Sequence, residues 1–395
     1  MKYIISNKSF NLIGSATIPG DKSISHRALI IPSMCIGKTK ITGLLESEDV
    51  FATMNALKTL GVKIYKSNKS WYVNGVGIFG FKQPTKYLNL GNSGTGARLI
   101  LGAMMGSNIL VNIKGDYSLS KRPMARILNP IKLMGAKIIS SNGNRLPITI
   151  KGPKDVLAIN YNSKISSAQI KSSILLAGLA ASGITTVTEP KKSRNHTEKM
   201  LLNFGAKIYS KTLKDGSNRV ELTGNPILKG RNINVPCDPS SAAFLIVAGI
   251  ICPGSKIELQ NIMINKSREG LFTTLKEMGA KIDVFNKREL DGETIASIHT
   301  EYSKLKGILV PSNRAPSMID EYPILSVAAA CAQGKTTMEG ISELRVKESD
   351  RIKIISDGLN KSGIKTLEKS NSLTVSGGNI NGGCTIDSEL DHRIA

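Results

Sequence analysis

Apolar residues gather in helix-length stretches that end in glycine, and two kinds of stretch alternate along the chain. In the first kind, the glycine is followed by one residue and then by lysine, as in LKTLGVKI; in the second, a longer apolar stretch ends directly in glycine, as in LIVAGIICPG. Each kind occurs several times, with a spacing of about 70 residues. The closing glycines are Gly61, Gly135, Gly205, Gly279 and Gly363 in the first kind, and Gly37, Gly106, Gly183, Gly254 and Gly334 in the second.

This alternation predicts a repeated α/β unit. A glycine just past a helix adopts the left-handed conformation that ends the helix, and the β-prone residues after it begin a strand. Each repeat therefore holds two helices and several strands. The longer helices are rich in small residues, which predicts that they are covered on all sides. Because the two kinds alternate without exception, chance similarity of short amphipathic helices is a poor explanation.

Polar residues that favour helix N-caps mark the start of the longer helix in each repeat. They are Asp21-Lys22-Ser23, Asn92-Ser93-Gly94, Ser166-Ser167, Ser240-Ser241 and Asp320-Glu321. A sixth start, Asp391-His392-Arg393, lies just before the last two residues. Complete repeats followed by an opened sixth lead us to expect a C-terminally truncated chain.

The composition is that of a globular protein with two domains or one large repeat fold. The chain has 395 residues, of which 41% are hydrophobic, so a substantial core is expected. The longest apolar run, residues 242–252, is too short to span a bilayer, and the N-terminus has no secretory signal. Scattered cysteines fit reduced thiols in a cytoplasm, and the histidines lack metal-ligand spacing, so we expect no zinc site.

The net charge of +23 is compatible with binding of nucleic acid, acidic lipid or small anions. The lysines are scattered, and aromatic residues make up 5% of the chain, which is few for a base-stacking surface. A solvated, lysine-rich surface explains the same composition. The positions of particular cations are therefore more informative than the total charge.

Two segments resemble anion sites at helix starts. In the first, GDKSISHR, Lys22, Ser23 and Arg27 fall within about one helical turn, where free N–H groups and cations favour an anion. In the second, GNSGTGAR, glycines around Gly94 let backbone N–H groups approach an anion, although no Walker A pair follows. Capped helices with solvated cations remain an alternative for both segments.

Four further segments carry candidate chemistry. Arg122 precedes a proline that is predicted at the first position of a helix, a rigid place for a guanidinium. SSAQ and SRNHTE are helix starts with hydroxyls and, in the second, an added cation; plain capping explains them equally well. Asp320 is followed by the alternating charges of LRVKESDRI, which fit either a solvated face or a site with acid, base and cations.

Taken together, GDKSISHR, GNSGTGAR, LSKRPM, SSAQIKSS, SRNHTEK, IDEYP, LRVKESDR and DHRIA resemble, in the same order, the motif series of the EPSP synthase family. The resemblance covers the chain from Lys22 to Ala395. It implies a two-domain inside-out α/β barrel built from βαβαββ repeats, three per domain, with the sixth repeat incomplete. Residues 20–236 would form the first domain, and residues 1–19 with 237–395 the second, discontinuous one.

The resemblance also implies the reaction: the enolpyruvyl group of phosphoenolpyruvate moves to the 5-hydroxyl of shikimate 3-phosphate and phosphate is released, in the shikimate pathway that leads to chorismate and the aromatic amino acids. No cofactor and no metal is implied, and the expected protein is a cytoplasmic monomer that binds neither nucleic acid nor membrane. Family members also carry a further lysine and a final helix beyond the DHR motif, which are missing here.

Residue roles follow from the resemblance motif by motif. Shikimate 3-phosphate would be held by Lys22, Ser23, Arg27, Ser167, Gln169, Ser193 and Arg194, and phosphoenolpyruvate by Gly94, Arg122, Arg351 and Arg393, with Lys22 near it. Lys347 would contact both substrates, Asp320 would be the base and Glu348 a proton donor. Arginines suit this task because they grip phosphates and carboxylates in bidentate fashion, and a paired acid and base can move both protons.

Two alternatives and one consequence remain at this stage. The enolpyruvyl transferase that acts on UDP-N-acetylglucosamine shares the fold, but typically carries a reactive cysteine near the Arg-Pro motif, and residues 115–123 contain none. A basic nucleic-acid-binding protein is suggested by charge alone. Glyphosate inhibits many members of the family, and resistant ones often have alanine where this chain has Gly94, so the resemblance implies a glyphosate-sensitive enzyme.

Overall fold

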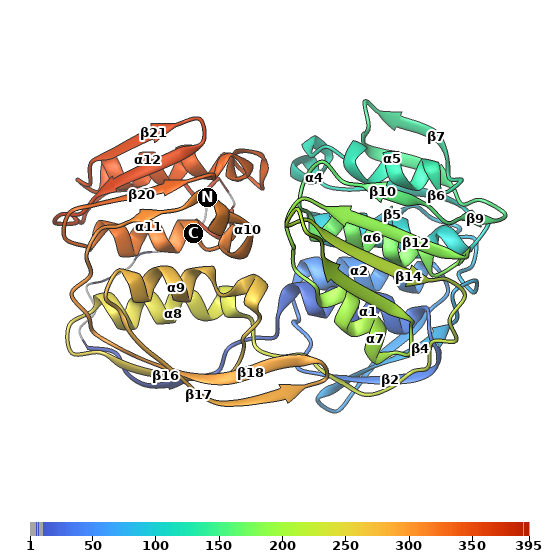
Figure 1. Cartoon of the computed structure of the whole chain (residues 1–395), viewed down its shortest axis with the longest axis horizontal. Helices are drawn as coiled ribbons and strands as arrows, with labels where there is room; N and C mark the ends of the chain where they lie inside the picture. The colour runs from blue at the N-terminus through green and yellow to red at the C-terminus, as the bar shows by residue number, and fades with distance from the viewer. Residues whose placement is uncertain (1–4, 6, 8–10, 390, 395) are drawn as a thin grey trace. The chain divides into compact units, whose positions relative to one another are not determined.

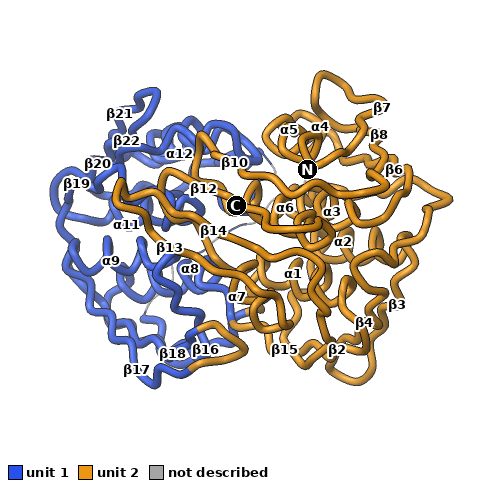
Figure 2. The backbone as a smooth tube through the Cα atoms, turned by 45° about the vertical axis from the view of Figure 1, so that its right-hand side comes forward, with its two compact units in different colours: residues 1–18, 237–288, 294–395 blue, residues 19–236, 289–293 orange. Residues whose placement is uncertain are grey.

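The computed structural model describes residues 5, 7, 11–389 and 391–394, and the chain folds as two compact units. Unit 1 comprises residues 1–18, 237–288 and 294–395 apart from the residues not described, and unit 2 comprises residues 19–236 and 289–293 (Figure 2). Both units are built from mixed sheets and helices (Figure 1). Ala395, the last residue of the DHRIA motif, lies outside the described residues.

Unit 2 contains four-stranded sheets with one repeated topology. The order is β15-β2-β4-β3, β5-β6-β8-β7 and β10-β12-β14-β13, in which the first pair is parallel and the others are antiparallel. A short pair, β9 with β11, lies beside them. The strands are β2 (Ile36–Thr42), β3 (Lys63–Ser67), β4 (Ser70–Val76), β5 (Leu88–Asn89), β6 (Leu110–Lys114), β7 (Lys137–Asn142), β8 (Arg145–Lys151), β9 (Val156–Leu157), β10 (Asn160–Asn162), β11 (Ala181–Ser182), β12 (Ile184–Glu189), β13 (Ile208–Thr212), β14 (Asn218–Thr223) and β15 (Ile233–Asn234).

Unit 1 repeats the same topology in the sheets β1-β16-β18-β17 and β19-β20-β22-β21. In each of the two units, a strand far away in sequence completes a sheet: β15 pairs with β2, and β1 pairs with β16. The strands are β1 (Ile13–Ala16), β16 (Lys256–Met263), β17 (Lys281–Leu290), β18 (Glu293–Glu301), β19 (Leu309–Val310), β20 (Lys335–Glu339), β21 (Thr366–Lys369) and β22 (Ser372–Ser376).

The alternation of two helices in each repeat is confirmed. The longer apolar stretches form α1 (Lys22–Ser33), α3 (Gly94–Ala103), α6 (Ala168–Gly178), α8 (Pro239–Ile251) and α11 (Tyr322–Ala330). The others form α2 (Glu48–Thr59), α5 (Ala125–Leu133), α7 (His196–Asn203), α9 (Gly270–Glu277) and α12 (Arg351–Lys361). Two short helices also occur: α4 (Tyr117–Lys121) just before α5, and α10 (Ala315–Met318) just before α11. Together with the family fold reported below, this confirms the predicted α/β class.

The helix-ending glycines adopt the predicted backbone conformation. Gly61, Gly135, Gly205, Gly279 and Gly363 all have φ between +84° and +105°, the left-handed region that ends a helix. Gly106 differs from the other glycines that close the longer helices, since it ends a 3₁₀ turn and has no positive φ. A Cβ at Gly106 would lie 2.6 Å from the carbonyl oxygen of Ile78, so close packing requires glycine at this position instead.

Two predicted helix starts are wrong in detail. Helix α8 begins before Ser240, because Asp238 caps it and accepts a hydrogen bond from the N–H of Ser240. Pro123 does not occupy the first position of a helix: α5 begins at Ala125, and Arg122 follows α4 in an extended conformation. Asp116 caps α4 by accepting from the N–H of Leu119, and this short helix places Arg122.

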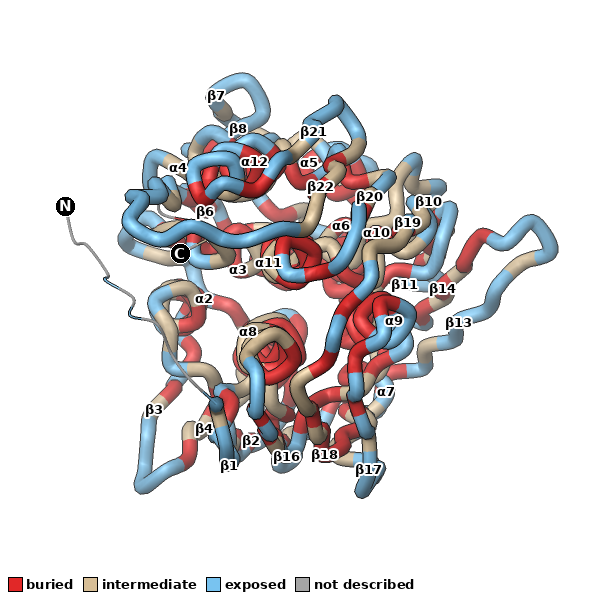
Figure 3. Tube along the Cα trace, turned by 90° about the vertical axis from the view of Figure 1, so that its left-hand side faces the viewer, coloured by how far each residue is buried: buried red, intermediate tan, exposed pale blue. Residues whose placement is uncertain are grey.

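The longer helices form the core of each unit, as their small residues predict. Within unit 2, α3 packs against α1 and α6, and a Cβ at Gly102 would lie 2.1 Å from the carbonyl oxygen of Ser173. Within unit 1, α8 packs against α11, and buried residues concentrate on these helices (Figure 3). Among the described residues, no helix is both long and apolar enough to cross a membrane.

Candidate functional site

The start of α1 carries the first group of predicted residues. Asp21 caps the helix by accepting from the N–H of Ile24 at 2.7 Å, so the free N–H groups of the first turn stay fixed. Lys22 is the first helical residue, and its Nζ lies 3.3 Å from Asp49 Oδ2 on α2. Both side chains are about one-quarter exposed, so Lys22 remains accessible to an anion.

Arg27 lies one turn further along α1 and is 3% exposed. Its guanidinium donates to Thr197 Oγ1 at 2.6 Å, to Ser172 Oγ at 2.9 Å and to the carbonyl oxygen of Ser23 at 2.8 Å. All three partners are neutral. Burial lowers the pKa of Arg27 to about 10, against the raising effect of the Glu198 carboxylate, and the positive charge of Arg194 lowers it further.

Gly94 begins α3 and faces Arg122. Ser93 caps the helix by accepting from the N–H of Gly96. A Cβ at Gly94 would lie 3.1 Å from Arg122 Nη1 and 3.2 Å from Arg98 Nη1. Arg122 donates to the side-chain oxygen of Asn92 and to Ser118 Oγ at 3.2 Å. The space at Gly94 is thus bounded by two guanidinium groups.

Gln169 joins α6 to α3 within unit 2. Its Oε1 accepts from Arg98 Nη1 at 2.6 Å, and its Nε2 donates to Thr95 Oγ1 at 3.0 Å. Ser167 is the N-cap residue of α6, but its side chain makes no capping hydrogen bond. This hydroxyl and the first N–H groups of α6 therefore suit an anion.

The segment 190–195 connects β12 to α7 and carries Ser193 and Arg194. Ser193 donates from its N–H to Glu189 Oε1 at 2.9 Å and from its Oγ to Glu189 Oε2 at 2.6 Å. A serine hydroxyl has one proton, so in this arrangement Ser193 has none to donate to a phosphate. Its neighbour Arg194 is half-buried.

A buried ion cluster lies beneath this segment. Lys171 on α6 is 1% exposed, and its Nζ lies 2.7 Å from Glu189 Oε1 and 2.8 Å from Glu198 Oε1. Burial by itself lowers the pKa of Lys171, but the Glu198 and Glu189 carboxylates outweigh burial and raise it. Lys171 therefore stays charged and links α6, β12 and α7.

Arg351 organises the predicted residues of unit 1. It begins α12 and is 1% exposed. Its Nε donates to Asp391 Oδ2 at 2.8 Å, its Nη2 donates to Glu348 Oε2 at 2.6 Å, and its Nη1 lies 3.6 Å from Asp320 Oδ1. Burial lowers the pKa of Arg351, but the hydrogen bond with Asp391 and the other carboxylates raise it above the usual value. One guanidinium therefore holds both Asp320 and Glu348.

Lys347 and Arg393 border this cluster. Burial lowers the pKa of Lys347, opposed by the Asp320 and Glu343 carboxylates. The N–H of Arg393 donates to Asp391 Oδ1 at 2.9 Å. Burial raises the pKa of Asp391, but Arg351 outweighs it, so the pKa is lowered and the carboxylate stays ionised.

Each unit thus brings its own predicted residues together. In unit 2 these are Lys22, Ser23, Arg27, Gly94, Arg122, Ser167, Gln169, Ser193 and Arg194; in unit 1 they are Asp320, Lys347, Glu348, Arg351 and Arg393. Sequence reasoning missed Thr197, Glu189 and Asp391 as partners of these residues. It also missed Lys171, although a lysine inside the apolar stretch AQIKSSILLAG is a signal for a buried, paired charge.

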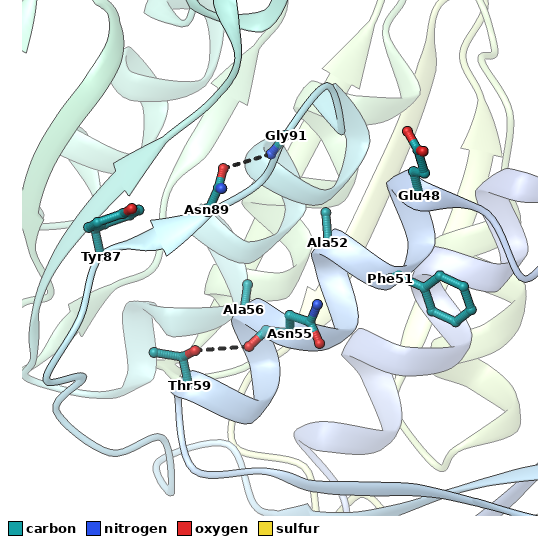
Figure 4. A pocket seen from close by; sticks show the side chains of 9 residues that line it. All are labelled: Glu48, Phe51, Ala52, Asn55, Ala56, Thr59, Tyr87, Asn89 and Gly91. Carbon is teal, nitrogen blue, oxygen red and sulfur yellow. Dashed lines mark hydrogen bonds between the residues drawn. The ribbon is translucent and has the colours of Figure 1, made fainter.

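A surface hollow on unit 2 is lined by other residues. It is bounded by α2 and by the segment from Tyr87 to Gly91 (Figure 4), and it contains none of the predicted site residues. Its lining is Glu48, Phe51, Ala52, Asn55, Ala56, Thr59, Tyr87, Asn89 and Gly91. With one carboxylate and no cation, this hollow does not suit a phosphate.

Comparison with known proteins gives one consistent result. The profile of a family described as EPSP synthase (3-phosphoshikimate 1-carboxyvinyltransferase) matches residues 7–395. A protein of Chelativorans sp. (strain BNC1) named 3-phosphoshikimate 1-carboxyvinyltransferase is 49% identical over 394 residues, which cover 99% of this chain and 88% of that protein. A protein of the same name from Afipia carboxidovorans is 51% identical over 386 residues, covering 97% of this chain and 87% of that protein.

Solved structures agree. An EPSP synthase from Acinetobacter baumannii matches with a TM-score of 0.85 and 43% sequence identity, covering 97% of this chain and 87% of that chain. A second structure of an EPSP synthase from the same organism matches with a TM-score of 0.84 and 42% identity. The similarity spans both units.

Proposed function

The chain belongs to the EPSP synthase (3-phosphoshikimate 1-carboxyvinyltransferase) family, and from this premise we propose how its own residues carry out the family reaction. The enzyme transfers the enolpyruvyl group of phosphoenolpyruvate to the 5-hydroxyl of shikimate 3-phosphate and releases phosphate. This step belongs to the shikimate pathway of aromatic amino-acid biosynthesis. The proposal assigns substrate binding mainly to unit 2 and proton transfer to unit 1.

Shikimate 3-phosphate is bound by the first turn of α1 and the start of α6. Arg27 supports this assignment, because its guanidinium is buried, cationic and bound only to neutral groups. Lys22, Ser23, Ser167, Gln169 and Arg194 complete the site. Ser193 acts on the same site indirectly, since its hydroxyl proton goes to Glu189.

For phosphoenolpyruvate, the resemblance assigns Gly94 and Arg122 in unit 2 and Arg351 and Arg393 in unit 1. In unit 2, Arg122 supplies a guanidinium fixed by Asn92 and Ser118, and Gly94 leaves room for an anion beside it. In unit 1, Arg351 and Arg393 contribute further positive charge. Lys347 contacts both substrates, and an anion beside it would favour its charged form.

Asp320 acts as the base and Glu348 as the proton donor. The single observation that carries this assignment is that Arg351 lies beside both carboxylates, 3.6 Å from Asp320 and 2.6 Å from Glu348. Both side chains remain about one-quarter exposed and accessible. In the addition step, Asp320 starts as the carboxylate and takes the proton of the 5-hydroxyl, and Glu348 starts as the protonated acid and gives its proton to the methylene carbon. In the elimination step, the Glu348 carboxylate takes a proton back from the methyl group and protonated Asp320 gives its proton to the departing phosphate. Cations stabilise the charge that shifts in the tetrahedral intermediate.

We further propose that residues 20–236 form one domain and that residues 1–19 with 237–395 form the other. The contact-based units support this division, with small differences at residue 19 and at residues 289–293. We expect a cytoplasmic monomer that needs no cofactor and binds no nucleic acid. Light scattering tests the monomeric state, and a gel-shift at physiological salt tests the absence of nucleic-acid binding.

The function is tested by phosphate release from phosphoenolpyruvate with shikimate 3-phosphate as the acceptor. UDP-N-acetylglucosamine serves as the alternative acceptor in a parallel reaction. We expect release with shikimate 3-phosphate and none with the nucleotide sugar. The reverse preference would overturn the assignment of the acceptor site to α1 and α6.

A further inference from the structure

The segment 190–195 of unit 2 carries Arg194 and is held in place by a buried carboxylate. We propose that Glu189 is a positioning residue for shikimate 3-phosphate, which acts by fixing this segment so that Arg194 meets the phosphate. The inference rests on the proposed function, which assigns Arg194 to that substrate. It adds a residue that the site itself does not contain, because Glu189 is 1% exposed and lies at the end of β12.

Glu189 uses both of its oxygens to hold the segment. Its Oε1 accepts from the N–H of Ser193 at 2.9 Å and from Lys171 Nζ at 2.7 Å, and its Oε2 accepts from Ser193 Oγ at 2.6 Å. Charge-assisted hydrogen bonds of this kind are stronger than neutral ones. The residue directly before Arg194 is therefore fixed at its backbone and at its side chain.

The same cluster ties the segment to the neighbouring helices. Lys171 bridges Glu189 to Glu198 of α7, and its Nζ lies 3.5 Å from the carbonyl oxygen of Ser193. At the other end of the segment, the N–H of Lys191 donates to Ser166 Oγ at 2.8 Å, just before α6 begins. Lys191 and Ser193, which both precede Arg194, are thus anchored, and Glu198 of α7, which follows it, is held by the same lysine.

The charge of the cluster suits an anion site that must exist before its ligand binds. Lys171 with Glu189 and Glu198 carries two negative charges and one positive charge. Glu198 raises the pKa of Arg27, and Arg194 lowers it. The contacts of Glu189 with Lys171 and Ser193 place a second buried carboxylate beside this segment, so its geometry is held before a phosphate binds.

A purely stabilising role accounts poorly for this cluster. A buried ion pair adds little stability compared with well-packed apolar side chains, because desolvation offsets the attraction. What the cluster provides is a fixed geometry at Ser193. We therefore expect loss of the cluster to weaken binding of shikimate 3-phosphate, and not only to lower the melting temperature.

The test replaces Glu189 with glutamine, which keeps the shape but removes the charge. We expect Glu189→Gln to raise the KM for shikimate 3-phosphate roughly 5- to 30-fold, the range for groups coupled in one hydrogen-bond network. The KM for phosphoenolpyruvate, and kcat with both substrates saturating, should stay within about twofold of the wild-type values, since sites that are not coupled affect each other by no more than this. An unchanged KM for shikimate 3-phosphate overturns the proposal.

The chain offers a matched control. Asp238 is also a buried carboxylate that pairs with a cation, Arg268 Nη2 at 3.2 Å, and accepts from a backbone N–H, that of Ser240 at 2.8 Å. It belongs to unit 1, whereas the segment 190–195 belongs to unit 2. Asp238→Asn should lower the melting temperature without changing the KM for shikimate 3-phosphate selectively. Equal effects of the two variants on that KM would reduce Glu189 to a structural residue.

A double-mutant cycle with Arg194→Ala separates this inference from the proposed function. If Glu189 acts through Arg194, Glu189→Gln adds little in the Arg194→Ala background. If Arg194→Ala alone leaves the KM for shikimate 3-phosphate unchanged, the assignment of Arg194 fails. If Arg194→Ala raises that KM and the two effects simply add, only the positioning role of Glu189 fails.

A milder variant covers the case in which Glu189→Gln does not fold. Ser193→Ala removes the hydrogen bond to Glu189 Oε2 and keeps the one from the backbone N–H to Oε1. We expect a rise of about threefold in the KM for shikimate 3-phosphate, as for loss of one hydrogen bond, again absent in the Arg194→Ala background. A rise that persists in that background overturns the route through Arg194.

Discussion

Arg27 in unit 2 and Arg351 in unit 1 are both buried arginines, yet their surroundings are opposite. Arg27 donates to two hydroxyls and a carbonyl, and its pKa falls to about 10 because of burial. Arg351 contacts three carboxylates, which outweigh burial and raise its pKa. From this difference we infer a division of labour: the charge of Arg27 is available for a substrate anion, whereas much of the charge of Arg351 holds Asp391 and the two carboxylates that we propose as base and proton donor.

The largest effect that follows from this comparison is the loss of turnover when Asp320 is replaced. Asp320→Asn keeps the size of the side chain and its place beside Arg351, but the amide is a poor acceptor for the hydroxyl proton. We expect kcat to fall by about 10²- to 10⁴-fold, as for loss of a general base. Steady-state phosphate release measures this, and the KM values should change little. Near-normal turnover would remove Asp320 from the mechanism.

The next effect is on stability. Arg351→Met leaves Asp391, which is 0% exposed, without its cation, so we expect a loss of about 3–5 kcal/mol in the free energy of unfolding at pH 7. In the wild type the pKa of Asp391 is lowered, so this pair stabilises the fold above the unfolded pKa of about 3.9. In the variant, burial raises that pKa, so the deficit relative to wild type should shrink as the pH falls towards 4.

Arg345→Met is the control for this measurement. Arg345 also contacts two carboxylates, Asp350 and Glu368, but its side chain is 25% exposed. Exposed ion pairs contribute about 0–1 kcal/mol, so chemical denaturation should show a small loss with no comparable pH dependence. Equal losses in the two variants would mean that burial of Asp391 does not set the size of the effect.

The smallest effect concerns Gly94. In Gly94→Ala the new methyl group would lie 3.1 Å from Arg122 Nη1 and 3.2 Å from Arg98 Nη1, so these side chains must shift slightly. We expect binding of glyphosate to weaken by about 1–3 kcal/mol and that of phosphoenolpyruvate by less, because the longer inhibitor tolerates less crowding. Inhibition at several phosphoenolpyruvate concentrations measures both. A glyphosate-resistant wild type, or equal weakening of both ligands, would contradict the placement of Gly94.

The repeats and the helix ends were predictable because they depend on local rules. A left-handed glycine ends a helix wherever it occurs, and the predicted glycines Gly61 to Gly363 follow that rule. The start of α8 was predicted less well, because both Asp238 and Ser240 favour capping and only the fold selects Asp238. Pro123 illustrates the same limit, since the short helix α4 shifts the start of α5.

The candidate residues were predicted from motifs, but their partners were not. Glu189 and Ser193 are only four residues apart, yet nothing in that spacing indicates that one carboxylate accepts both bonds. Thr197 and Asp391 lie 170 and 40 residues from the arginines that they contact, so only the tertiary structure brings them together. Their roles therefore required the structure, whereas the identity of the family did not.

The central claim is that the charge of Arg27 is reserved for shikimate 3-phosphate, and calorimetric binding of that substrate alone tests it most directly. Arg27→Met should weaken binding by about 2–4 kcal/mol, as for loss of a charged partner in a desolvated site. It also removes the donor to Thr197, Ser172 and the Ser23 carbonyl, so the melting temperature without ligand should fall as well. Asp320→Asn should bind it with near-normal affinity. Unchanged affinity in Arg27→Met would contradict the account.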